Sequence, residues 1–234
     1  MTQLRSALFM AWFLTLTLVM AVIFLPLLAA PRKATVWMVR HWARATLWGL
    51  RVFSGIGMRL IGEAPQGGVL VASKHMSMWD TLALYLALDD PGIVIKRELL
   101  RIPFYGWYLW KAAAIPIDRG AGAEALRRMT QAAKHVLAEG RPILIFPEGT
   151  RKKPGAQPDY KPGVAVLYSL LNVTCVPVAL DSGRYWQGFT KHPGIISLEF
   201  LPLIPPGLKR RDFMARLEKE IEAATGRLLD GKTI

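Results

Sequence analysis

A histidine and an aspartate five positions apart, His75 and Asp80, form the first group in the sequence that could do chemistry. On a continuous helix this spacing separates two side chains by about 140°, so they would not meet. They can meet if His75 lies in a turn and Asp80 in the first turn of the following helix, with Ser77 as the N-cap residue. A neutral imidazole can then accept a hydroxyl proton while the carboxylate fixes its tautomer. The alternative is that Asp80 only completes a capping box and His75 is a surface residue.

A second group follows an apolar run, where the sequence ILIFPEGTR at residues 143–151 predicts a buried strand that ends in a polar turn. Ligand sites in open α/β sheets lie at the carboxyl ends of strands, where this turn falls. Gly149 and Thr150 are expected to leave backbone N–H groups approachable, and Arg151 offers a guanidinium suited to phosphate. A surface ion pair is the alternative for such an arginine.

These two groups belong to a pattern of short apolar runs that alternate with helical stretches from Gly67 onward. The pattern predicts an α/β domain over residues 63–234, with a mostly parallel central sheet flanked by helices. The predicted strands cover residues 69–72, 93–95, 114–117, 143–146, 174–179 and 195–200. The predicted helices cover residues 79–87, 122–138, 163–171 and 211–224.

The first 62 residues differ from the rest in charge, because they carry seven basic side chains and no acidic ones. Residues 63–234 carry 23 basic and 17 acidic side chains. The uncharged run at residues 6–31 is long enough to cross a bilayer core, which takes about 20 apolar residues. A secretory signal peptide is the alternative, since Arg5 precedes the run and small residues end it.

The stretch that follows, residues 35–60, combines arginines with tryptophans. At helical spacing three arginines share one stripe: Arg40, Arg44 and Arg51. Trp37 and Trp48 lie beside that stripe, and such a face suits anionic headgroups, although a solvated face of an ordinary helix would look similar. We therefore predict a membrane-associated helix pair over residues 1–62. By the positive-inside rule we expect the body on the cytoplasmic side, and we expect the membrane to be the cell inner membrane.

The composition limits the remaining classes of function. The chain has 234 residues and a net charge of +13, and 52% of its residues are hydrophobic, which excludes a disordered basic tail. Its single cysteine, Cys175, cannot form an intramolecular disulfide and is expected to pack in a strand. The four histidines are scattered, which argues against a metal site. The body has no stripe of basic and aromatic residues, so nucleic-acid binding is disfavoured.

Taken together, the motifs resemble those of the glycerolipid acyltransferases, specifically the 1-acyl-sn-glycerol-3-phosphate acyltransferase family. The resemblance is carried by His75-x4-Asp80 and by FPEGTR at residues 146–151. Blocks in the same order support it, namely residues 96–99 with 102–106, residues 115–119 and residues 176–179. One departure is Lys74, where many members have asparagine before the histidine.

The resemblance implies transfer of a fatty acyl group from a thioester to the free hydroxyl of lysophosphatidic acid, giving phosphatidic acid. His75 would be the general base and Asp80 would orient it. The acyl donor would be carried by coenzyme A or by acyl carrier protein, and no metal or dissociable cofactor is implied. The residues implied in binding the glycerol phosphate are Lys96, Arg119, Glu148, Gly149, Thr150 and Arg151.

Two other functions stay open from the sequence. The acceptor could be another lysophospholipid or a lyso-aminolipid, because the same chemistry serves any free hydroxyl. The chain could also be a non-catalytic protein that binds a membrane surface, with His75 incidental.

Overall fold

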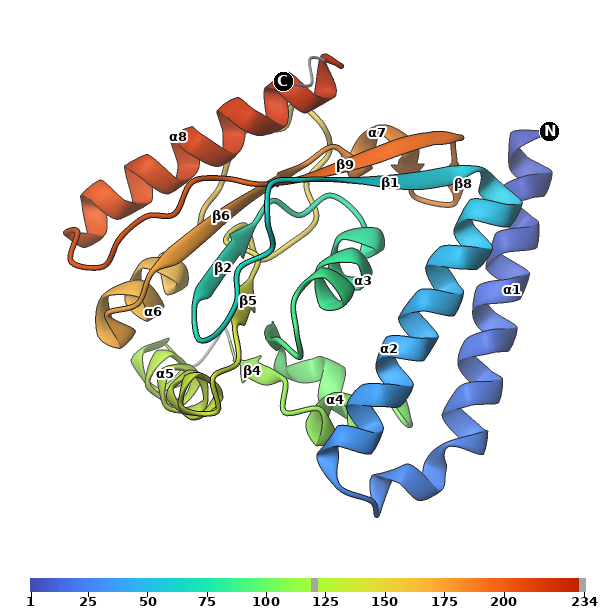
Figure 1. Ribbon diagram of the computed structural model, residues 1–234, viewed down its shortest axis with the longest axis horizontal. Helices are drawn as coiled ribbons and strands as arrows, with labels where there is room; N and C mark the ends of the chain where they lie inside the picture. Colours follow the sequence, from blue (N-terminus) through green and yellow to red (C-terminus); the bar gives the residue numbers. More distant parts are fainter. Residues whose placement is uncertain (119–121, 232–234) are drawn as a thin grey trace.

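The computed structural model describes residues 1–118 and 122–231 and has a helical hairpin beside an α/β body (Figure 1). The hairpin consists of α1 (Thr2–Ile23), the 3-10 turn η1 (Leu25–Leu28) and α2 (Arg32–Gly49), which runs on into the π-helical η2 (Leu50–Ser54). Indole N–H groups join its two arms: Trp12 donates to the carbonyl of Ala45 at 3.1 Å, and Trp42 to the hydroxyl of Thr17 at 3.0 Å.

The helical part ends earlier than the sequence predicts. Gly55 adopts a φ of +68°, a left-handed conformation that ends a helix and that glycine tolerates well. The chain then continues as strand β1 (Ile56–Ile61), which pairs in parallel with β9 (Gly194–Phe200). The expectation that the helix pair extends to residue 62 is therefore wrong, because residues 56–61 form an edge strand of the sheet.

Within the described residues, the central sheet has seven strands in the order β1-β9-β6-β2-β5-β3-β4, and β6–β9 is the antiparallel pair in it. This confirms the predicted α/β fold with a mostly parallel sheet, and every predicted strand is present. Its other strands are β2 (Leu70–Ser73), β3 (Gly92–Lys96), β4 (Ile115–Ile117), β5 (Ile143–Ile145) and β6 (Cys175–Leu180). A small hairpin, β7 (Trp186–Gln187) with β8 (Thr190–Lys191), lies outside this sheet.

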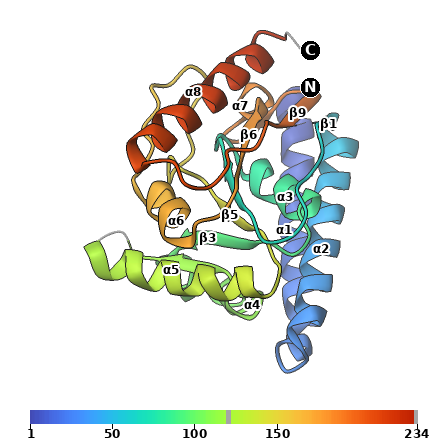
Figure 2. The same cartoon turned by 60° about the vertical axis from the view of Figure 1, so that its left-hand side comes forward.

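Helices cover both faces of the sheet, as Figure 2 shows from the side. Their bounds are α3 (Met78–Ala87), η3 (Arg97–Arg101), α4 (Tyr105–Lys111), α5 (Gly122–Ala138), α6 (Gly163–Leu171), α7 (Ser182–Tyr185) and α8 (Arg210–Leu229). Strand residues alternate between two cores: Leu70 and Ala72 pack with α5, α6 and α8, whereas Val71 packs with α3 and α1. Strands buried on both faces are typical of parallel sheets.

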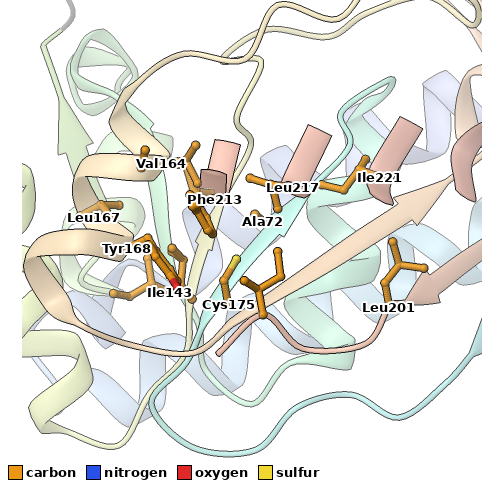
Figure 3. Packing of buried hydrophobic residues seen from close by; sticks show 14 of the residues in the cluster. Ala72, Ile143, Val164, Leu167, Tyr168, Cys175, Leu201, Phe213, Leu217 and Ile221 are labelled. Atoms are coloured by element: carbon orange, nitrogen blue, oxygen red, sulfur yellow. The ribbon is translucent and has the colours of Figure 1, made fainter. Parts of the chain in front are cut away.

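The first of these cores contains the lone cysteine (Figure 3). Tyr168 of α6 and Phe213 of α8 stack there with ring centroids 3.8 Å apart. Cys175 is fully buried below them, and burial raises the pKa of its thiol. The thiol is therefore a packing group, as the sequence predicts.

The hairpin is held against the body by buried and charged contacts. Phe9 of α1 is fully buried in the second core, and the guanidinium of Arg32 donates to both oxygens of Asp90 at 2.9 and 2.6 Å. The hydroxyl of Tyr108 in α4 donates to the carbonyl of Ala21 at 2.9 Å. Of the described helices, α1 is the one that is long and apolar enough to cross a membrane, and most of its length is not buried by the body.

One arginine of the predicted basic stripe faces the body instead of the outside. Arg40 donates to the carbonyls of Tyr85, Leu86 and Leu88, at distances of 3.2 to 3.4 Å. These carbonyls lie at the end of α3, where the negative end of the helix dipole attracts a cation. Arg44 and Arg51 are exposed as expected.

Candidate active site

His75 and Asp80 meet in the geometry that their spacing requires. His75 lies in the turn between β2 and α3, and its Nδ1 is 3.0 Å from Oδ2 of Asp80. Ser77 is the N-cap of α3, with an extended backbone, and it forms a capping box with Asp80. The imidazole is 12% exposed and the carboxylate is fully buried. With Nδ1 facing the carboxylate, Nε2 is the nitrogen left to accept a proton.

Both oxygens of the Asp80 carboxylate accept hydrogen bonds. Oδ2 accepts the backbone N–H groups of Met76 at 2.6 Å and Ser77 at 2.8 Å. Oδ1 accepts the hydroxyl of Ser77 at 3.0 Å and the hydroxyl of Ser182. The orientation of Asp80 is thus fixed by donors from two parts of the chain.

Ser182 is the residue of this group that the sequence analysis missed. It begins α7 immediately after β6, the strand that neighbours β2 in the sheet. Because the ends of neighbouring parallel strands meet at one edge, the position of Ser182 after a predicted strand was a signal that could have found it. Beside it, Asp181 accepts the backbone N–H of Ser197 at 2.8 Å, and burial raises the pKa of Asp181 to about 6.

The FPEGTR turn packs directly on the histidine. The rings of Phe146 and His75 stack with centroids 4.0 Å apart, and the backbone N–H of Lys152 donates to the carbonyl of His75 at 2.8 Å. Gly149 has a φ of +63°, which a turn with glycine accommodates. Its N–H donates to the carbonyl of Phe146 at 2.9 Å. This amide, which we expected to be approachable, is therefore engaged within the turn.

Glu148 of the same turn faces the protein interior. It is buried, and its carboxylate accepts Nζ of Lys74 at 2.8 Å and the backbone N–H of His75 at 3.2 Å. Burial raises the pKa of Glu148, and the neighbouring ammonium of Lys74 counters that rise. These contacts favour a positioning role for Glu148, and its predicted contact with substrate stays a prediction.

Lys74 in turn joins this turn to the last helix. Its Nζ donates to Glu222 of α8 at 2.7 Å, and Glu222 also accepts the hydroxyl of Tyr160 at 2.9 Å. The lysine is thus buried between two carboxylates, which offset the cost of burying its charge.

Three of the four remaining predicted binding residues lie at the protein surface. Thr150 and Arg151 are exposed at the end of the turn, and Lys96 is exposed at the carboxyl end of β3. Arg119 lies outside the described residues. The charge of Arg151 acts on Tyr105 of α4, lowering a tyrosine pKa that burial raises.

An apolar cavity of about 410 Å³ lies between the hairpin, α3 and α4. Its lining includes Thr81 and Leu82, which directly follow Asp80, together with Tyr105. Leu14 and Leu18 of α1 line the opposite side. An elongated apolar group is the chemical class of ligand that such a lining accommodates.

Among residues 1–118 and 122–231, no group of three or more histidine, cysteine, aspartate or glutamate side chains is placed to hold a metal ion. The His75–Asp80 pair can transfer a proton, because a buried carboxylate orients its imidazole.

Comparisons with known proteins agree with this arrangement. The acyltransferase family matches residues 58–181 of the chain. The 1-acyl-sn-glycerol-3-phosphate acyltransferase of Pseudomonas aeruginosa is 33% identical over 189 residues, covering 79% of this chain and 74% of its own length. The alpha form from sheep, Ovis aries, is 30% identical over 186 residues, covering 75% of this chain and 64% of its own.

A solved structure has the same fold. The crystal structure of the 1-acyl-sn-glycerophosphate acyltransferase from Thermotoga maritima is similar with a TM-score of 0.79 at 19% identity, over 97% of this chain and 98% of the other. The resemblance that the motifs predicted is thereby confirmed, and the chain belongs to the 1-acyl-sn-glycerol-3-phosphate acyltransferase family of acyltransferases.

Proposed function

We propose that this protein transfers a fatty acyl group from an acyl thioester to the free hydroxyl of 1-acyl-sn-glycerol 3-phosphate, forming phosphatidic acid. The observation that carries the proposal is the His75–Asp80 pair, set at the end of a central strand and stacked against the FPEGTR turn. The names of the similar proteins describe the same reaction.

In the proposed mechanism His75 is the general base. Its Nε2 takes the proton of the acceptor hydroxyl as the oxygen attacks the thioester carbonyl, and Asp80 stabilises the imidazolium that forms. The tetrahedral intermediate collapses by breaking the carbon–sulfur bond, and the thiolate leaves with the carrier and takes up the proton. The ester and the free thiol are the products, so the balance requires no metal and no dissociable cofactor.

The acceptor's phosphate would be bound by Arg151 and Thr150, with Lys96 and Arg119 as further partners. Arg151 supports this role because it is exposed beside the catalytic turn and acts electrostatically on Tyr105, a residue of the cavity wall. A guanidinium binds phosphate oxygens through two parallel hydrogen bonds. An acyl chain would occupy the cavity between α1, α3 and α4.

We further propose that the protein works at the cell inner membrane with its body on the cytoplasmic side. The apolar surface of α1 supports membrane association, and the excess of basic residues after the apolar run supports the orientation. The partners are then membrane lipids, lysophosphatidic acid and the acyl carrier, with nucleic acid excluded from the proposal.

The test is an assay of the purified protein with radiolabelled acyl-coenzyme A or acyl-acyl carrier protein, each crossed with several lysolipid acceptors. We expect turnover on lysophosphatidic acid with at least one donor. Turnover on another lysophospholipid or a lyso-aminolipid alone would change the acceptor and keep the chemistry. Vesicle binding without turnover on any acceptor would contradict the enzymatic proposal.

A further inference from the structure

The segment from Arg97 to Lys111, formed by η3 and α4, carries an exposed aromatic surface that the proposed mechanism does not use. Trp110 is 71% exposed and Trp107 is 47% exposed, although tryptophan is usually well buried in soluble proteins. The two indoles are three residues apart and share a helix face with Lys111. Neither indole lines the apolar cavity, whose wall in α4 comes from Tyr105, Tyr108 and Leu109.

This surface is continuous with the apolar surface of α1 through the rim of the cavity. Leu14 and Leu18 of α1 are 58% and 64% exposed, and both line the cavity. Ile102 is 45% exposed and lines it from the other side. Exposed apolar side chains from both elements thus line one cavity.

The η3–α4 corner is held rigidly in this place. A Cβ at Gly106 would lie 2.2 Å from the carbonyl oxygen of Leu100, so η3 and α4 pack more closely than a side chain allows. The hydroxyl of Tyr108 fixes α4 to the carbonyl of Ala21 in α1. The aromatic surface therefore keeps a fixed orientation relative to α1.

The charge of the segment favours an anionic partner. Residues 97–111 carry three basic side chains and one acidic side chain, and Arg97 pairs with Asp118 after the segment at 3.3 Å. Indoles flanked by lysine and arginine are typical of the interfacial layer of an anionic bilayer, where the rings lie at headgroup depth.

We infer that η3–α4 is a second membrane-contacting element, which dips into the headgroups of an anionic bilayer and holds the opening of the cavity at the lipid surface. A lysolipid could then enter the cavity by lateral movement from the bilayer, with its phosphate remaining in the headgroup layer near Arg151. The inference rests on the proposed function for its substrate, and on the geometry of α1 and α4 for its surface.

The test uses the full chain, extruded vesicles with and without anionic phosphatidylglycerol, and the double variant Trp107→Ser/Trp110→Ser. The matched control is Leu170→Ser/Leu203→Ser, since these leucines are 51% and 57% exposed. They belong to α6 and to the chain between β9 and α8, on the side of the body opposite the hairpin (Figure 1). Circular dichroism melts would check that both variants fold.

We expect the tryptophan variant to bind anionic vesicles roughly ten-fold less tightly in co-sedimentation, because two interfacial anchors are lost. Its turnover on lysophosphatidic acid embedded in vesicles should fall similarly, while its rate on a short-chain lysolipid dissolved as monomer stays unchanged. The control should match the wild type in every assay.

Wild-type vesicle binding by the tryptophan variant would overturn the inference. An equal loss on the monomeric substrate would also overturn it, because α4 would then act on the catalytic site. Sedimentation of the wild type as a dimer that the tryptophan variant loses would show that a second copy covers this surface. Absence of turnover by the wild type would count against the proposed function alone, since the binding comparison does not depend on it.

Discussion

At the scale of single residues, the site depends on how firmly Asp80 is held. Its carboxylate accepts two backbone N–H groups and two serine hydroxyls, so it presents one orientation to Nδ1 of His75. A fixed carboxylate keeps the imidazole in one tautomer and one ring position, which a general base requires. Ser182 supplies one of these donors from outside the turn.

Replacing Ser182 with alanine should lower kcat on the order of ten-fold with little change in KM, because a hydrogen bond to a charged group is worth about 1.5–3 kcal/mol. Steady-state kinetics on lysophosphatidic acid would measure this. Ser54→Ala is the matched control, since the buried Ser54 hydroxyl finds no partner within the described residues. A Ser182→Ala enzyme with the kcat of the wild type would show that the backbone donors suffice.

The sequence indicated the contact of His75 with Asp80, because a capping box involves residues that are close together in the chain. It did not contain the contacts of Ser182 with Asp80 or of Glu222 with Lys74, which join positions more than one hundred residues apart. Such pairs follow from strand order and helix packing. From the sequence, one could predict only which residues lie directly after the strands.

At the scale of elements, the candidate site residues in the described part of the chain lie where strands end and turns or helices begin, and α8 packs on one face of the sheet beside them. Lys74 joins the FPEGTR turn to α8 by hydrogen bonds to Glu148 and Glu222. The strands were predictable as apolar runs buried on both faces. Strand β1 was not, because Gly57 and Arg59 interrupt its apolar pattern within a basic, tryptophan-rich stretch.

Glu222→Gln should lower the free energy of unfolding by about 1–2 kcal/mol, because Lys74 would keep only one carboxylate in a buried site. Urea denaturation would measure the change. Glu124→Gln makes the same substitution on α5, where the exposed Glu124 pairs with Arg127 at 2.9 Å and with Arg128 at 2.7 Å. These are i,i+3 and i,i+4 contacts at the helix surface, so their loss should leave the free energy of unfolding nearly unchanged. Equal losses in the two variants would contradict the special role of Lys74.

The contact between β6 and β9 should make stability depend on pH through Asp181. Burial raises the pKa of this carboxyl from its ordinary 3.8 to about 6, so the native state binds the proton more tightly than the unfolded chain. Asp181 therefore contributes stability below about pH 4 that is lost as the pH rises through about 6.

In Asp181→Asn this part of the pH dependence should disappear, because the amide oxygen still accepts the N–H of Ser197 without titrating. Urea denaturation of both proteins between pH 4 and pH 7.5 is the measurement. A parallel pH dependence in the variant and the wild type would assign the effect to other groups.

At the scale of the whole molecule, the net charge of +13 is divided between the first 62 residues and the body. The hairpin carries its basic residues beside the apolar helix α1. Phe9 and the ion pair of Arg32 with Asp90 hold the hairpin against the body. The apolar cavity lies between this hairpin and helices α3 and α4 of the body. Both the hairpin and the body were predicted from the composition of the chain. Arg40 was wrongly expected at the membrane, because helical spacing alone does not show that α3 packs against the face of α2 that carries it.

In the proposed mechanism an oriented imidazole, and no enzyme nucleophile, drives acyl transfer. The most direct measurement is the initial rate of purified His75→Ala and Cys175→Ala with a labelled acyl thioester and lysophosphatidic acid in anionic vesicles. We predict a loss of about 10²- to 10⁴-fold for His75→Ala with vesicle binding retained, and a rate near that of the wild type for Cys175→Ala. A His75→Ala rate within a few-fold of the wild type, or loss of activity in a folded Cys175→Ala, would contradict this mechanism.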